Sequence, residues 1–153
     1  NGQSPHSIHA IVEGGDVQQI GQTIFDKISA GCAMDGDIEV DALDIQGLPH
    51  QIFFDRPTYS DVYITVNLTK RPGYPTNGAA LIKQYLTDYG LTLNIGQPLL
   101  NARLYTPVNL VPNHYITSIT AGISPSPTSE NNINVAYDGL IRIDPSRIVV
   151  NEV

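Results

Sequence analysis

The chain has 153 residues and a net charge of −7, with 41% hydrophobic and only 15% charged residues. This acidic balance disfavours nucleic acid and anionic membrane surfaces as partners, because both attract Lys and Arg. No apolar run approaches the roughly 20 residues that span a bilayer, so we expect neither a membrane span nor a signal peptide. The charged fraction lies below the roughly 25% of average soluble proteins, which favours packing against other proteins. Because the sequence starts without Met, we expect a piece of a longer protein.

The opening of the chain predicts a strand, a glycine turn and a capped helix. Residues 7–13 alternate between two faces, as a half-buried strand does. Gly14 and Gly15 interrupt the strand, and Asp16 stands three residues before Gln19, the spacing of a capping box. A helix is then predicted up to a stop at Gly31, with these apolar residues at helical intervals: Val17, Ile20, Ile24 and Ile28.

Three further strands are predicted in the middle of the chain. Residues 38–43 and 62–69 alternate between apolar and polar side chains, and residues 51–54 form a short apolar run. Turn residues at 46–49 and 56–57 separate these strands.

Two helices are predicted next. The first follows Asn77 and ends at Gly90, and its buried stripe consists of Ile82, Tyr85, Leu86 and Tyr89. The second is shorter, begins at Pro98 and turns Leu100 and Leu104 inward.

The end of the chain predicts strands over residues 115–123, 135–143 and 148–150. Residues 124–132 have low complexity and no apolar anchor, so we expect a hairpin tip or a connection that a partner orders. The whole pattern predicts an α+β two-layer sandwich, with a mostly antiparallel sheet and helices packed on one face. It fits one compact unit, or two small α+β subdomains at about residues 1–70 and 71–153.

Metal-binding residues do not converge in this pattern. His6 and His9 would point to opposite faces of a strand, and His50 and His114 are isolated. Four carboxylates at period two would line one strand face and could bind Ca²⁺, but no EF-hand loop surrounds them. We favour a solvated strand face for this acidic run, which comprises Asp35, Asp37, Glu39, Asp41 and Asp44.

No catalytic or cofactor-binding motif is present, so we expect no catalytic, cofactor-binding or metal-binding residues, no cofactor and no enzymatic activity. The single cysteine, Cys32, has no adjacent base, and we expect a small buried apolar residue rather than a nucleophile. Asp16 occupies the helix start after Gly14 and Gly15, which favours a cap over an anion site. Eight tyrosines could form a sugar-stacking or protein-binding surface, although Tyr85 and Tyr89 fit the core edge of a helix.

The segment from Pro5 to Asp16, followed by Ile20, Ile24 and residues 29–31, resembles the baseplate J-like family of Mu- and P2-type phage tails. This first motif is fairly specific, because it couples a particular strand with its turn and helix. Looser similarity continues through residues 56–57, 120–128 and 148–153, so the resemblance covers most of the chain and matches the family's C-terminal portion. The chain departs from the family at His9, where members often carry an acidic residue, and in the loop at residues 32–35.

The resemblance implies a structural, non-catalytic component of a contractile-tail baseplate, in a phage virion or a prophage-derived contractile injection system. The partners it implies are hub proteins, wedge neighbours, tail-fibre attachment proteins and further copies of the chain. The implied location is the virion tail baseplate, and the host cytoplasm during assembly. The alternative hypothesis is a carbohydrate- or receptor-binding module, in which exposed tyrosines bind the ligand and the acidic strand binds Ca²⁺. A third, a hydrolase with paired carboxylates, has no positive signal in the sequence.

Overall fold

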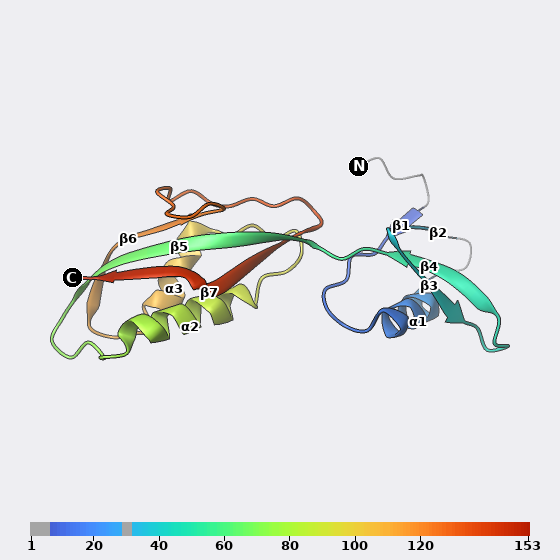
Figure 1. Ribbon diagram of the computed structural model, residues 1–153, viewed down its shortest axis with the longest axis horizontal. Coiled ribbons are helices and arrows are strands. Elements are labelled where there is room, and N and C mark those ends of the chain that lie inside the picture. The colour runs from blue at the N-terminus through green and yellow to red at the C-terminus, as the bar shows by residue number, and fades with distance from the viewer. Residues whose placement is uncertain (1–6, 29–31) are drawn as a thin grey trace. The chain divides into compact units, whose positions relative to one another are not determined.

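The computed structural model describes residues 7–28 and 32–153 (Figure 1). The chain forms two compact units, Asn1–Pro57 and Thr58–Val153. The boundary therefore lies at residue 57 and not near residue 70, because residues 58–70 form the middle strand of the second unit's sheet. The predicted α+β class is confirmed, with helices packed against sheets.

In its described residues, the first unit contains one helix and two strand pairs: β1 (Ser7–His9), α1 (Val17–Lys27), β2 (Ala33–Asp35), β3 (Ile38–Leu43) and β4 (Pro49–Phe54). β1 pairs with β2 in parallel, and β3 pairs with β4 antiparallel. The strand predicted over residues 7–13 is shorter than expected, because only its first three residues pair with β2. The backbone of Ala10 and Val12 bonds to Asp55 instead.

The predicted cap of α1 is confirmed. Oδ1 of Asp16 accepts a hydrogen bond from the backbone N–H of Gln19 at 3.0 Å. One face of the helix packs on the β3–β4 hairpin, through Ile20, Ile24 and Phe25 against Val40, Ala42, Ile52 and Phe54. Val17 was predicted on this face but is 38% exposed. The helix ends at Lys27, and the predicted stop at Gly31 lies outside the described residues.

In the second unit, a three-stranded sheet packs on a layer of helices. Its elements in chain order are β5 (Thr58–Lys70), α2 (Gly78–Gly90), the 3-10 helix η1 (Asn101–Leu104), α3 (Tyr105–Val108), β6 (His114–Gly122) and β7 (Gly139–Glu152). The strand order is β6–β5–β7, with β5 antiparallel to β6 and parallel to β7. Alternate residues of β5 are fully buried, as predicted: Val62, Ile64, Val66 and Leu68.

Helix α2 packs closely on β7, and Ile82 and Leu86 are fully buried. The helix ends at Gly90, as predicted. A Cβ atom at this glycine would lie 2.8 Å from Cβ of Ile143, so the close approach of the helix to β7 requires glycine.

Two predictions in the second half are wrong in detail. The helix expected from Pro98 starts at residue 101, as a 3-10 turn that leads into α3. Leu100 is 39% exposed, whereas Leu99 is buried and is held by paired backbone hydrogen bonds with Ile133. The two closing strands are one strand, β7, whose register is irregular between Ile143 and Ile148, the partners of Val62 and Ile64 on β5.

The low-complexity segment 124–132 is bonded to the second unit itself. Its backbone accepts hydrogen bonds from the Thr120 hydroxyl (2.8 Å, at Pro127) and from the Ala121 N–H (2.9 Å, at Ser129). The segment therefore lies along the outer edge of β6 at Thr120 and Ala121, near the C-terminal end of that strand.

Candidate functional site

The acidic residues do not share one strand face, contrary to the prediction. Asp35 lies in β2, opposite His9 of β1, whereas Glu39 and Asp41 lie in β3. Gln51 donates a hydrogen bond to Glu39 at 2.6 Å across the hairpin. In residues 7–28 and 32–153, no three His, Cys, Asp or Glu side chains form a group that could hold a metal ion.

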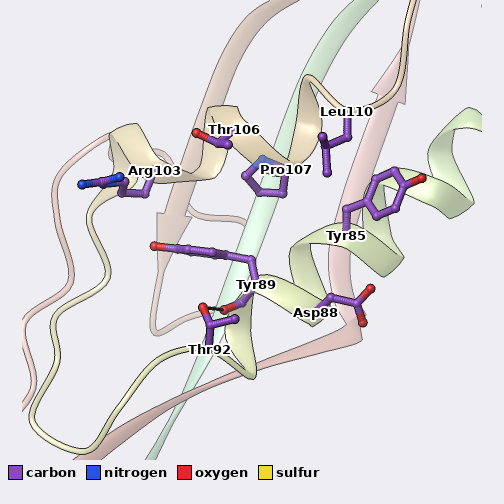
Figure 2. Close-up of a pocket in the computed structure, with 8 residues that line it drawn as sticks. All are labelled: Tyr85, Asp88, Tyr89, Thr92, Arg103, Thr106, Pro107 and Leu110. Atoms are coloured by element: carbon purple, nitrogen blue, oxygen red, sulfur yellow. Dashed lines mark hydrogen bonds between the residues drawn. The ribbon is translucent and has the colours of Figure 1, made fainter.

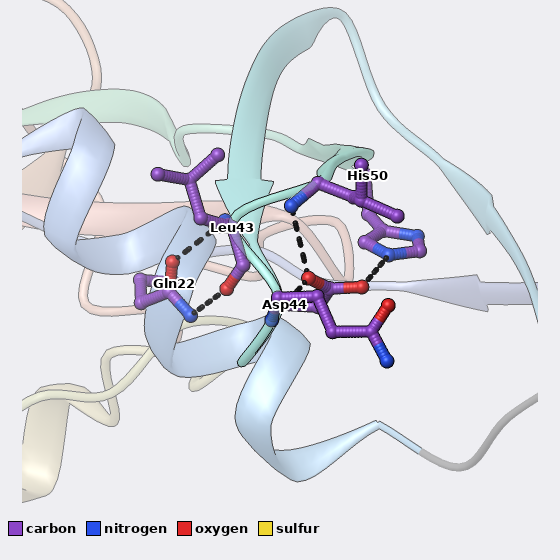
Figure 3. Close-up of polar contacts among 6 residues, drawn as sticks. Gln22, Leu43, Asp44 and His50 are labelled. Carbon is purple, nitrogen blue, oxygen red and sulfur yellow. Dashed lines mark hydrogen bonds and ion pairs between the residues drawn. The ribbon is translucent and has the colours of Figure 1, made fainter.

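Asp44 and His50 brace the β3–β4 turn (Figure 3). Oδ1 of Asp44 accepts the backbone N–H of Leu48 at 2.9 Å, and Oδ2 lies 3.2 Å from Nε2 of His50. The hydrogen bond from the Leu48 N–H is the largest cause that lowers the pKa of Asp44 below its usual value, and the hydrogen bond with His50 is the next. Next to the turn, the side-chain amide of Gln22 donates to the carbonyl of Leu43 and accepts from its N–H, both at 3.0 Å. These contacts fix the end of β3 against α1.

The remaining histidines belong to separate elements. Nε2 of His9 lies 2.6 Å from Oδ2 of Asp55, whose other oxygen accepts the Asp37 N–H at 2.6 Å. The Asp37 N–H is the larger cause of the lowered pKa of Asp55, and His9 adds to it. His114, in the second unit, packs edge-on against Tyr74 with ring centroids 6.0 Å apart. His6 lies outside the described residues.

Cys32 is exposed, so the expectation of a buried residue is wrong. It precedes β2, and the residue of that segment that packs against the core is Met34.

All eight tyrosines lie in the second unit, but the exposed ones do not form one surface. Tyr59 and Tyr115 are 45% and 56% exposed. Tyr115 pairs with Thr69, ten residues along β5 from Tyr59, a separation of about 33 Å in an extended strand. A ligand that contacted both Tyr59 and Tyr115 would therefore need that length, whereas Tyr137, 54% exposed, precedes β7 at the end of the sheet where Tyr59 lies.

The sheet face opposite the helices carries a charged cluster that sequence reasoning missed. Asp61 on β5 accepts hydrogen bonds from Arg142 at 2.7 Å and from Arg147 at 2.8 Å. The two guanidinium groups also lie over the rings of Tyr59 and Tyr63, at 4.9 and 5.8 Å from the centroids. Arg142 is the first cause of the lowered pKa of Asp61, and Asp61 in turn raises the pKa of Arg142.

The same face continues as a row of amides and hydroxyls across the three strands. Nδ2 of Asn67 donates to the hydroxyl of Ser118 at 2.9 Å, and Nδ2 of Asn151 donates to Oδ1 of Asn67 at 2.8 Å. Val149, which pairs with Thr65 on this face, is 50% exposed. Hydrogen bonds between strands therefore hold the polar side chains of this face in place, and the exposed apolar side chain of Val149 lies on the same face.

A pocket of the second unit, called the larger hollow below, lies between α2 and α3 on the helix layer (Figure 2). Its volume is about 410 Å³. Tyr85 and Tyr89, one turn apart on α2, face Pro107 and Leu110 across it. Arg103 stands at one end of the hollow, and Asp88 lies toward the Tyr85 end (Figure 2).

These residues could not be grouped from the sequence. The hydrogen bonds from Arg142 and Arg147 to Asp61 span 81 and 86 residues. Arg103 lies in a short 3-10 turn without a recognisable motif. The position of Asp61 on the polar side of β5 was the one signal that could have placed it on the sheet face opposite the helices.

None of the helices in the described parts of the chain has the length and hydropathy of a membrane span. In comparisons with known proteins, the chain matches no family model and no curated protein.

Proposed function

We propose that this chain is a structural, non-catalytic component of a contractile phage-tail baseplate, where it packs against hub, wedge and tail-fibre attachment proteins. The observation that carries the proposal is the open side of the second unit. This side, called the open face below, comprises the sheet surface opposite α2 and the outer edge of β7.

The open face suits a protein partner because its side chains are already fixed. The contacts of Asp61 with its two arginines and of Asn67 with its neighbours hold these groups in place across the strands. A surface that is ordered before binding loses little conformational entropy when a partner docks. Val149 supplies an exposed apolar contact in the midst of these polar groups.

Strand β7 adds a second means of association. It is 14 residues long and, among the described residues, pairs only with β5. The outer edge of such a strand presents N–H and C=O groups to which a strand of another chain can bond. A neighbour could therefore extend this sheet as well as cover its face.

The segment that carries the family resemblance also fits the proposal. Gly14 and Gly15 have φ values of +64° and +78°, which favour glycine, and the capped helix α1 follows them directly. The motif thus consists of a strand, a glycine turn and a helix, the combination on which the resemblance depends.

Immunogold electron microscopy tests the proposal. Antibodies raised against the chain should label one end of the contractile particles purified from the source strain, at the baseplate. Label along the sheath, or on no particle, would refute the assignment.

A pair of variants tests whether the open face mediates assembly. Val149→Arg should lower incorporation into particles several-fold, because a buried interface tolerates an unpaired charge poorly. Ile45→Arg is the matched control, since Ile45 is fully exposed in the β3–β4 turn of the first unit and belongs neither to the open face nor to the hollow between α2 and α3. Both variants should retain the far-UV circular dichroism of the parent. Equal incorporation of the two would exclude the open face as the interface.

A further inference from the structure

A second surface of the same unit, on its helix layer, forms an elongated groove. The hollow between α2 and α3 continues into a smaller one of about 220 Å³, and both are lined by Tyr89 and Arg103. Pro98 and Leu100 form the far wall of the smaller hollow. Two hollows in a row, joined at one tyrosine and one arginine, fit an extended segment better than a compact ligand.

The wall of the larger hollow is mainly apolar, and the smaller hollow combines Pro98 and Leu100 with polar side chains. Leu110 at the larger hollow is 62% exposed, and Leu100 at the smaller one is 39% exposed. Tyr85 and Tyr89 add two aromatic rings at i and i+4 of α2, so they share one face of the helix. Each hollow can therefore take one apolar side chain, and the larger has the size of ordinary ligand pockets.

Arg103 is the charged group at the junction of the hollows. In the part of the chain that the structure describes, it is the one arginine whose guanidinium has no hydrogen bond, ion pair or aromatic contact. The other four bind carbonyls, carboxylates or tyrosines: Arg56, Arg71, Arg142 and Arg147. A guanidinium offers five donors in a planar fork, which matches a carboxylate. Asp88, at the Tyr85 end, disfavours a second acid there.

We propose that this groove binds an extended peptide segment of a neighbouring protein, with an acidic residue between two large apolar ones. The carboxylate pairs with Arg103, and the apolar side chains, two residues to either side, enter the two hollows. Side chains at that spacing point to the same side of an extended chain. This inference rests on the proposed assembly function. The groove would be a second docking surface for neighbouring proteins, on the helix layer, opposite the open face. Peptide titration tests the groove alone and immunogold labelling tests the assembly role, so the two proposals can fail separately.

The probe is the synthetic peptide acetyl-Gly-Leu-Gly-Glu-Gly-Leu-Gly-amide, which reads the same in both directions, so its orientation in the groove need not be known. Its control has Gln in place of Glu. Titration into the ¹⁵N-labelled full chain should shift amides of residues 85–92 and 97–110, and the Glu peptide should bind about fivefold more tightly. This ratio should fall as salt is raised.

Variants then assign the effect to single side chains. Arg103→Gln should remove the preference for Glu over Gln, whereas Lys83→Gln, which removes a cation of α2 that lines neither hollow, should retain it. Leu110→Ser should weaken both peptides equally. The proposal is overturned if the two peptides bind the parent equally, or if neither shifts these amides at millimolar concentration. It is also overturned if 3-phenylpropionate binds as tightly as the peptide, which would indicate a small-molecule site.

Discussion

Replacing Gly21 by alanine tests how α1 packs on β3. Gly21 lies inside the helix, where alanine ordinarily stabilises by about 0.8–1 kcal/mol relative to glycine. Here the residue is buried, and an alanine Cβ would overlap Cγ1 of Val40 and lie 3.4 Å from its Cβ and Cγ2. Because Val40 is itself only 8% exposed, overpacking should cost about 1–3 kcal/mol. The net expectation is that Gly21→Ala destabilises the first unit by about 1 kcal/mol, because the overpacking cost exceeds the gain in helix propensity.

The reciprocal substitution sharpens this test. Val40→Ala alone should cost about 2 kcal/mol, because it removes two buried methyl groups and leaves a cavity. In the double variant, the new methyl group of residue 21 occupies the space that Cγ1 vacates. The double variant should therefore be more stable than the sum of the single effects predicts, by about 1–3 kcal/mol.

The two units can be followed separately. All tyrosines lie in the second unit, so urea unfolding followed by tyrosine fluorescence reports on that unit. Its urea midpoint should be the same in the parent and in these variants. Native-state hydrogen exchange of the β3 and β4 amides reports on the first unit. Thr23→Ala is the control on an exposed position of α1 and should change stability by about 0.5 kcal/mol or less. If Gly21→Ala stabilises the first unit and its effect adds to that of Val40→Ala, the close helix–strand contact does not exist.

Three further predictions concern charges. Asp16→Ala should lower the stability of the first unit by about 0.5–2 kcal/mol in hydrogen exchange, and Asp16→Asn, which can still cap, by less; equal losses would contradict the cap. Asp44, Asp55 and Asp61 have pKa values lowered in the folded chain, so their stabilising effect is complete above the unfolded value near 3.9 and is lost as pH falls through the folded values. The urea midpoint should therefore decrease when the pH is lowered below about 4. Asp61→Asn should make this decrease smaller for the second unit. An equal pH dependence of the midpoint in parent and variant would argue against the Asp61 cluster. EDTA or excess Ca²⁺ should leave the thermal midpoint unchanged, whereas a specific ion site would add about 2–4 kcal/mol and several degrees.

The local patterns of the sequence predicted most of the secondary structure. Alternation identified β3 and the buried side of β5, because side chains of a strand take opposite faces in turn. The three-residue spacing of Asp16 and Gln19 identified the start of α1, because a cap bonds to a backbone N–H within the first turn. The α+β class followed from the order of these elements.

Only the tertiary structure decided which distant segments meet. β5 pairs in parallel with β7, whose first residue, Gly139, lies opposite Thr58, and this pairing brings Asp61 to its arginines. The groove at Arg103 likewise depends on α2 and α3 lying together on one side of the sheet. Local periodicity indicates which face of a helix or strand is apolar. Which other element packs against that face depends on how all the elements of the unit pack together. The open face and the groove arise from that choice, and the sequence alone could not place them.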